Sequence, residues 1–231
     1  MPIELPFYKL PFLTLFYADC MDIMRQYPDK YFDLAIVDPP YGIREDGHRE
    51  NNRSKLAKSK KYHKALWDQP RPDENYFKEL FRVSKNQIIW GANNYPEYLR
   101  QSPCWLVWNK NNSGNFADCE LAYGSFETAV RMFTFTWNGM IQGDMKNKEN
   151  RIHPTQKPVQ LYRWILRNYA KPDQKILDTH FGSGSIALAV DKANRLDKMN
   201  LHLTACEIDE DYCKSAVKRI SESIKQGTLS F

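Results

Sequence analysis

Residues 175–185 read KILDTHFGSGS and join an apolar run to a glycine-rich turn. An apolar run ends in an acidic residue, Asp178, and is followed by the small residues Gly182, Ser183 and Gly184. Small residues let the backbone approach a ligand closely at the exposed amide end of the next helix. The stretch therefore predicts a strand, a ligand-binding turn and a helix, with a purely structural tight turn as the alternative.

A second acidic residue, Glu207, closes the next apolar run along the chain. An acidic residue at this position of a nucleotide-binding βαβ unit typically accepts hydrogen bonds from ribose hydroxyls. The turn does not follow the GxGxxG spacing that suits a dinucleotide pyrophosphate. A nucleoside that carries an amino acid fits better, and Asp178 is placed to accept a hydrogen bond from its amine or a hydroxyl.

The segment FDLAIVDPPYG at residues 32–42 is the strongest functional signal. Its strand ends in Asp38, and the two prolines that follow have fixed φ and no N–H to donate. The carbonyls of Asp38 and Pro39 are therefore expected to face outward as acceptors at the carboxyl end of the strand, where open α/β sheets place their active sites. Tyr41 adds a face on which a planar base can stack. A rigid turn without chemistry is the alternative.

These groups suit one reaction, the alkylation of an aromatic amine. Such an amine is a poor nucleophile because its lone pair is delocalised into the ring. Two acceptors, the Asp38 carboxylate and a backbone carbonyl, would bind both amine hydrogens and free the lone pair for in-line attack on a sulfonium methyl. This is catalysis by positioning and electrostatics, and it requires neither a metal nor a cysteine nucleophile.

Short apolar runs alternate with amphipathic stretches along the chain, which is the pattern of an α/β protein. The 231 residues are expected to form one domain. Asp209 is predicted to cap the last helix. Strands are expected at residues 13–17, 34–37, 87–90, 105–108, 129–135, 175–177 and 203–206, and helices at 73–83, 159–170, 185–193 and 210–225.

The composition is typical of a globular protein in a reducing compartment. Hydrophobic residues make up 42% of it, so a packed core is expected. Its five scattered cysteines form no CxxC pair, which argues against a zinc site or a disulfide framework and for a reducing cytoplasm. No apolar run approaches the ~20 residues that span a bilayer. The net charge of +5 suits a polyanionic partner, although many proteins that bind no nucleic acid share it.

At this point the chain resembles a known family, the amino-methyltransferases of DNA, and in particular their circularly permuted beta group. In that group the DPPY motif precedes the cofactor turn, as it does here. Residues 17–20, YADC, resemble the early G-D-C motif, with Ala18 in place of the usual glycine. Residues 153–158, HPTQKP, match the H-P-T-x-K-P motif before the cofactor strand. The resemblance covers residues 15–220 in outline.

The resemblance implies a Rossmann-like methyltransferase fold with a seven-stranded, mostly parallel sheet and one antiparallel edge strand. It implies S-adenosylmethionine as cofactor, S-adenosylhomocysteine as product, and no metal. Lys157 and Thr155 are expected to meet the methionine carboxylate, with helix capping as the alternative. His180 is given no role. The resemblance assigns Asp38, Pro39, Pro40 and Tyr41 to the target base, and Asp19, His153, Thr155, Lys157, Asp178, Phe181, Gly182, Gly184, Ser185 and Glu207 to the cofactor.

Double-stranded DNA is the expected partner, and adenine the expected target, because cytosine-N4 enzymes of this type more often begin the motif with Ser. A cytosine-N4 enzyme and a catalytically silent DNA-binding subunit are the alternatives. Little of the chain is left for a target-recognition domain, so recognition is expected from loops 44–64 and 109–118 or from the second subunit of a homodimer. Loop 44–64 is predicted to contact phosphates, or else to be merely solvated; the residues expected to touch DNA are Arg53, Lys55, Lys58, Lys60, Lys61 and Lys64.

Overall fold

The computed structural model describes residues 5–42, 71–111, 117–138 and 141–228. A mixed nine-stranded sheet is its centre, and a separate two-stranded ribbon lies beside it. The nine strands are β1 (Tyr8–Leu10), β2 (Leu13–Tyr17), β3 (Phe32–Val37), β4 (Ser84–Trp90), β5 (Trp105–Asn109), β6 (Cys119–Gly124), β7 (Arg131–Thr134), β10 (Lys175–Asp178) and β11 (His202–Glu207). The ribbon pairs β8 (Trp137–Asn138) with β9 (Ile141–Gln142).

The strand order is β1-β2-β11-β10-β3-β4-β6-β5-β7. The five strands from β2 to β4 are mutually parallel. This confirms the predicted α/β fold with a mostly parallel sheet. Two details differ from the expectation. The described sheet has nine strands instead of seven. An antiparallel strand, β1, does lie at an edge, but a second antiparallel strand, β6, lies between β4 and β5.

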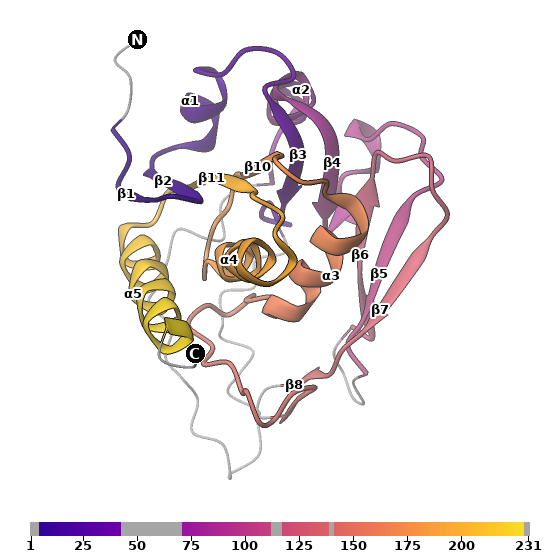
Figure 1. Ribbon diagram of the computed structural model, residues 1–231. Coiled ribbons are helices and arrows are strands. Elements are labelled where there is room, and N and C mark those ends of the chain that lie inside the picture. Colours follow the sequence, from indigo (N-terminus) through magenta and orange to yellow (C-terminus); the bar gives the residue numbers. More distant parts are fainter. Residues whose placement is uncertain (1–4, 43–70, 112–116, 139–140, 229–231) are drawn as a thin grey trace.

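Helices cover both faces of the sheet (Figure 1). On one face, α3 (Val159–Tyr169), α4 (Ser185–Asp197) and α5 (Glu210–Thr228) pack in one hydrophobic cluster with Leu34 and Ile36 of β3. On the other face, α2 (Glu74–Val83) packs with Ala35 and Val37 in a second cluster. Successive side chains of a strand point to opposite faces, so the continuous apolar run of β3 is explained by burial on both sides.

Short helices complete the second face, namely α1 (Cys20–Met24) and the 3-10 turns η2 (Ala92–Asn94) and η3 (Pro96–Tyr98). Several helices begin where the sequence places a capping acid. The Asp73 carboxylate accepts the Tyr76 amide at the start of α2, and Asp209 accepts the amides of Asp211 and Tyr212 at the start of α5. The predicted cap at Asp209 is therefore confirmed.

The parallel strands end at a common edge, and this edge carries the motifs. Asp38 follows β3, Asp178 ends β10 and Glu207 ends β11. Between β10 and β3 the chain reverses its direction of travel across the sheet, because β10 leads through α4 to β11 while β3 leads through α2 to β4. Ligands of open α/β sheets bind in the crevice outside such a switch point. Among the described residues, no helix is long and apolar enough to cross a membrane.

Candidate active site

The DPPY segment leaves β3 in a fixed conformation. The Tyr41 hydroxyl donates to Asp38 Oδ1 at 2.6 Å. The hydroxyl of the fully buried Tyr95 shares its one hydrogen between the carbonyl oxygens of Pro39 at 2.9 Å and Pro40 at 2.6 Å. The prediction that the Pro39 carbonyl is a ready acceptor needs a correction, because Tyr95 already occupies one of its two lone pairs. The second lone pair is the one that a ligand would use.

Tyr41 is packed rather than freely presented as a stacking face. Gly91, directly after β4, has a φ of +65°, in the left-handed region that glycine adopts without penalty. A Cβ built on Gly91 would lie 2.0 Å from Cε1 of Tyr41. Burial raises the pKa of Tyr41 well above its ordinary value, and the charge of Asp38 adds to this. The phenol therefore remains a hydrogen-bond donor to Asp38 at any working pH.

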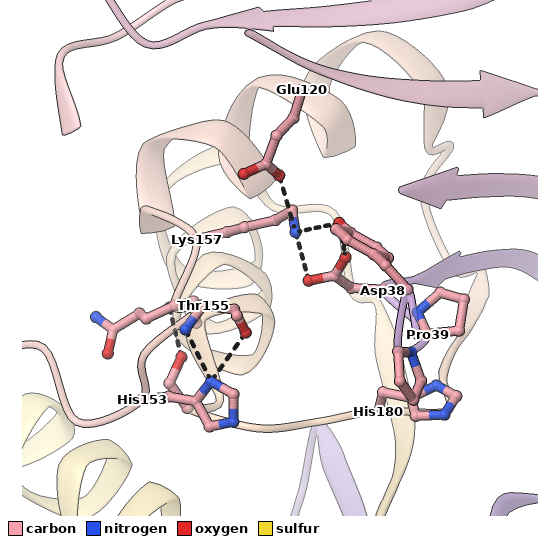
Figure 2. Close-up of polar contacts among 12 residues, drawn as sticks. Asp38, Pro39, Glu120, His153, Thr155, Lys157 and His180 are labelled. Atoms are coloured by element: carbon pink, nitrogen blue, oxygen red, sulfur yellow. Dashed lines mark hydrogen bonds and ion pairs between the residues drawn. The ribbon is translucent and has the colours of Figure 1, made fainter. Parts of the chain in front are cut away.

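Lys157 lies at the centre of the polar contacts drawn in Figure 2. Its ammonium contacts Asp38 Oδ2 and lies 3.2 Å from Glu120 Oε2. Only 3% of this side chain is exposed. Lys157 was expected to meet the methionine carboxylate; here two carboxylates of the chain already balance its charge. Thr155 is exposed, and its hydroxyl lies 3.0 Å from Nδ1 of the buried His153.

The Gly-rich turn opens α4 without a side-chain cap. Gly182 and Gly184 have φ of +50° and +70°. A Cβ on Gly184 would press on the Phe181 ring at 3.1 Å and on Ile220 at 3.2 Å. The ring of Phe181 belongs to the hydrophobic core, so its packing holds the turn against the body of the protein. The turn predicted from residues 175–185 is thereby confirmed as a strand-turn-helix unit.

Arg219 of α5 holds the far side of this turn. Its guanidinium donates to the Ser183 carbonyl at 2.9 Å and to Ser185 Oγ at 3.0 Å. The same group pairs with Glu149, whose other oxygen accepts the Val159 amide at the start of α3. No pattern in the sequence indicates these contacts, because they join residues that are far apart in the chain.

Two buried carboxylates flank the turn. Asp178 accepts the His180 amide at 3.0 Å, and burial raises the pKa of Asp178 to about 8. Glu207 accepts the amides of Gly182 at 2.7 Å and Asp209 at 3.0 Å, and burial raises its pKa as well. A buried acid with a raised pKa is a site that a cationic ligand would stabilise in its charged form.

A cavity of about 210 Å³ joins the two motifs. Pro40 of the DPPY segment lines it together with Glu207 and Asp19, the acid that caps α1. His180 and Thr179 line it from the Gly-rich side, although His180 was given no role. Burial lowers the pKa of His180 to about 4, so its ring is neutral. A larger cavity of about 440 Å³ lies along α2 and η3 and contains no motif residue.

These groups fit a nucleoside that carries a cationic amino acid. The residues that would hold it are Asp19 and Glu207 for the nucleoside, with Asp178 and the uncapped amides of α4 for the amino-acid part. No group of three or more His, Cys, Asp or Glu side chains able to hold a metal ion occurs in the described part of the chain. The predicted phosphate-contacting residues of loop 44–64 lie outside the described residues, as do residues 112–116 of loop 109–118.

Sequence reasoning also missed Tyr95, Gly91 and Glu120. Tyr95 and Gly91 follow β4 and are brought to Pro39 and Tyr41 only by the parallel pairing of β3 with β4. Glu120 lies on β6, a strand that was not predicted because its run CELAYG lacks β-branched residues. Gly91, a glycine directly after an apolar strand, was the one sequence signal that could have pointed to a close contact here.

Comparisons with known proteins agree with this geometry. The model of a family described as DNA methylase matches residues 105–218. Type II methyltransferase M.HinfI of Haemophilus influenzae is 24% identical over 90% of this chain and 68% of its own length. Putative methylase YubD of Escherichia coli K12 is 23% identical over 92% of this chain and 93% of its own length.

Solved structures with the same fold include two methyltransferases. The M1.HpyAVI complex with SAM has a TM-score of 0.54 and 15% identity, covering 90% of this chain and 98% of that one. PvuII DNA methyltransferase, described as cytosine-N4-specific, has a TM-score of 0.59 and 12% identity, covering 94% of this chain and 89% of that one. The match to the family model and the similarity to both relatives, taken with the motifs gathered at one sheet edge, show that the chain is similar to DNA methylases.

Proposed function

We propose that the protein transfers a methyl group from S-adenosylmethionine to the exocyclic N6 amine of adenine in DNA. The observation that carries the proposal is the Asp38 carboxylate at the carboxyl end of β3. Asp38 lies one residue from Pro39 and two from Pro40, which lines the cavity together with Glu207 and Asp19. An acceptor for an amine and a pocket for a nucleoside thus meet at the switch point of the sheet.

The residues of the DPPY segment would hold the amine by its two hydrogens. One hydrogen bonds to the Asp38 carboxylate and the other to the free lone pair of the Pro39 carbonyl. Tyr41 and Tyr95 fix these acceptors, since their hydroxyls bond Asp38 and Pro39. Acceptors that are fixed before the substrate arrives cost no reorganisation during the reaction.

S-adenosylmethionine supplies an electrophilic methyl on its sulfonium sulfur. The amine nitrogen forms the new C–N bond as the methyl–sulfur bond breaks, and the sulfur keeps the bonding electron pair as a thioether. One amine hydrogen then leaves as a proton to solvent, which restores a neutral secondary amine. Asp178, with its raised pKa, would be ionised while the cationic cofactor is bound. After the product has left, its carboxylate would bind a proton again.

Adenine is proposed over cytosine because the motif begins with Asp38. The fold does not discriminate between them, since a cytosine-N4-specific enzyme shares it. A silent DNA-binding subunit is the second candidate. It is not favoured, because it would not need the buried acids Asp178 and Glu207 beside the uncapped α4.

DNA contact is proposed for loop 44–64, which begins three residues after Tyr41. Its lysines would bind phosphates while the target base is turned out of the duplex, a step that costs a few kcal/mol. A homodimer, in which a second copy supplies further DNA contacts, is proposed as the working assembly.

The test is a methylation reaction with purified protein, labelled S-adenosylmethionine and unmethylated DNA, followed by digestion to nucleosides and mass spectrometry. N6-methyldeoxyadenosine is expected. N4-methyldeoxycytidine would move the proposal to the cytosine enzyme. Tight cofactor binding without any methylated nucleoside would contradict both.

A further inference from the structure

Four side chains of alternating charge run from Asp38 toward the surface. Lys157 contacts Asp38, Glu120 Oε2 lies 3.2 Å from the Lys157 ammonium, and Glu120 Oε1 lies 2.5 Å from that of Lys110. These residues come from different elements: the end of β3, the segment before α3, strand β6 and the residue after β5. Figure 2 shows Glu120 and Asp38 approaching the Lys157 ammonium from two sides.

The surroundings of Lys157 leave its ammonium few other partners. The charge lies 5.5 Å from the centre of the Trp90 ring and 5.9 Å from that of Tyr41, and its third neighbour is the Tyr41 hydroxyl at 3.4 Å. Burial alone would lower the pKa of Lys157, but the charges of Asp38 and Glu120 outweigh it and raise the pKa. The residue is therefore a permanent cation that two carboxylates share.

This sharing bears on the reaction, because both oxygens of Asp38 are engaged. Tyr41 bonds Oδ1 and Lys157 contacts Oδ2. A target amine can use the remaining lone pairs of Asp38, but it must share the carboxylate with the Lys157 ammonium, whose positive charge weakens Asp38 as an acceptor. Glu120 offers that ammonium a second anion within 3.2 Å, so a small shift toward Glu120 releases Asp38 without leaving a buried charge unpaired.

We propose that Glu120 is a positioning residue for the methyl transfer, and that it acts through Lys157. Glu120 draws the Lys157 ammonium away from Asp38 as the target amine binds, and Lys110 keeps Glu120 ionised by pairing with its outer oxygen. The inference rests on the proposed amine methylation, and it adds two residues, Glu120 and Lys110, that the motifs of the chain do not contain.

The test is a double-mutant cycle on the single-turnover rate of methyl transfer at saturating DNA and cofactor. The variants are Glu120→Gln, Lys157→Gln and the double variant. Glu120→Gln keeps the size of the side chain and removes its charge, which leaves the whole attraction of Lys157 on Asp38. We expect the rate to fall about tenfold or more, in the range of couplings between residues in contact. In the Lys157→Gln background the same change should alter the rate less than about twofold.

Controls separate this role from a structural one. Glu120→Asp retains the charge and should stay within about threefold of the wild-type rate. Glu74→Gln removes an exposed glutamate that pairs with Lys78 on the surface, and should leave the rate unchanged. The dissociation constant for S-adenosylmethionine should change less than about twofold in Glu120→Gln, because Glu120 does not line the cofactor cavity.

The outcomes are distinct. Equal rate losses from Glu120→Gln in both backgrounds, or a loss in Glu120→Asp as large as in Glu120→Gln, would overturn the inference. If Lys157→Gln has no measurable rate, the methyl-transfer rates of Glu120→Gln and Glu120→Asp decide whether the charge of Glu120 is required. A wild-type protein that binds the cofactor and methylates no DNA would instead overturn the proposed function, and this inference with it.

Discussion

Replacing Gly91 by alanine should disable the site through the Tyr41 ring. The new Cβ would lie 2.0 Å from Tyr41 Cε1. Carbon atoms rest at ~3.5–4.0 Å, so the ring must move by roughly 1.5 Å. The backbone adds to the effect, because φ at this position is +65°. The left-handed conformation costs about 1–2 kcal/mol for a residue with a side chain, and overpacking typically costs about 1–3 kcal/mol.

The expected result is a fold that is less stable by roughly 2–5 kcal/mol and a methyl-transfer rate reduced by about 100-fold. The rate falls because Tyr41 orients Asp38, and misplacing a positioned group by about 1 Å costs about that factor. Cofactor affinity should be kept. Single-turnover methylation, isothermal titration of S-adenosylmethionine and thermal unfolding measure the three quantities.

Gly143→Ala is the matched control. Its Cβ would meet the Phe135 ring at 2.8 Å, outside the site. It should lower stability and leave the rate intact. A Gly91→Ala protein with the wild-type rate would refute the role given to the packing of Tyr41.

Three further predictions follow from the cofactor side and from the loop. Glu207→Ala should weaken cofactor binding by about 1.5–3 kcal/mol, the range for hydrogen bonds to a charged group. The variant loses both the acceptor for the ribose and the carboxylate that accepts the Gly182 amide. An unchanged Michaelis constant for the cofactor would contradict this. Cofactor affinity should rise with pH by up to about tenfold per unit until it levels near pH 8, because a bound cation favours ionised Asp178. Calorimetry in buffers of different ionisation enthalpy should then detect a proton released on cofactor binding at pH 7. Changing Lys58, Lys60 and Lys61 together to alanine should weaken DNA binding and lower the slope of its salt dependence by about one unit for each lost phosphate contact, and an unchanged slope would make loop 44–64 a bystander.

The raised pKa of Asp178 also makes the stability of the fold depend on pH. Burial raises the pKa of Asp178 from 3.8 to about 8 in the cofactor-free protein. A folded-state pKa above the unfolded value stabilises the fold at low pH, and that contribution declines as pH rises from about 4 to 8. A bound cation should therefore protect the protein against unfolding most strongly near pH 8, and Asp178→Asn should abolish this pH dependence.

The parallel half of the sheet was predictable from the sequence because its signals are local. The runs before Asp38, Asp178 and Glu207 are short, apolar and closed by an acid, and each became a strand whose carboxyl end carries that acid. The predicted cap Asp209 marked the start of α5 because a capping acid is also a local signal. A local pattern that agrees with the global fold is informative at every level.

The antiparallel half was less predictable. Strand β6 contains Ala122 and Gly124 and reads as a weak strand, yet it is held between β4 and β5 by pairing on both sides. Strand β1 is a three-residue edge strand that pairs with β2 across Pro11 and Phe12. Tertiary pairing overrides weak local preference in both cases.

The candidate site divides in the same way. The motifs gave Asp38, Tyr41, Asp178 and Glu207, because these lie within a few residues of a strand end. The partners of these residues depend on long-range packing: Tyr95 on Pro39, and Lys157 on Asp38 across 119 residues of chain. No spacing in the sequence encodes such contacts.

The proposed function depends above all on Asp38 holding the amine of an adenine in DNA. The most direct measurement is modified-base sequencing of DNA from cells that express the wild-type chain or its Asp38→Ala variant, paired with cofactor titration of both purified proteins. We expect N6-methyladenine at one sequence context with the wild type and none with the variant, and cofactor affinities of the two proteins within several-fold of each other. Methylation that persists in the variant, or a modified base other than adenine with the wild type, would contradict it.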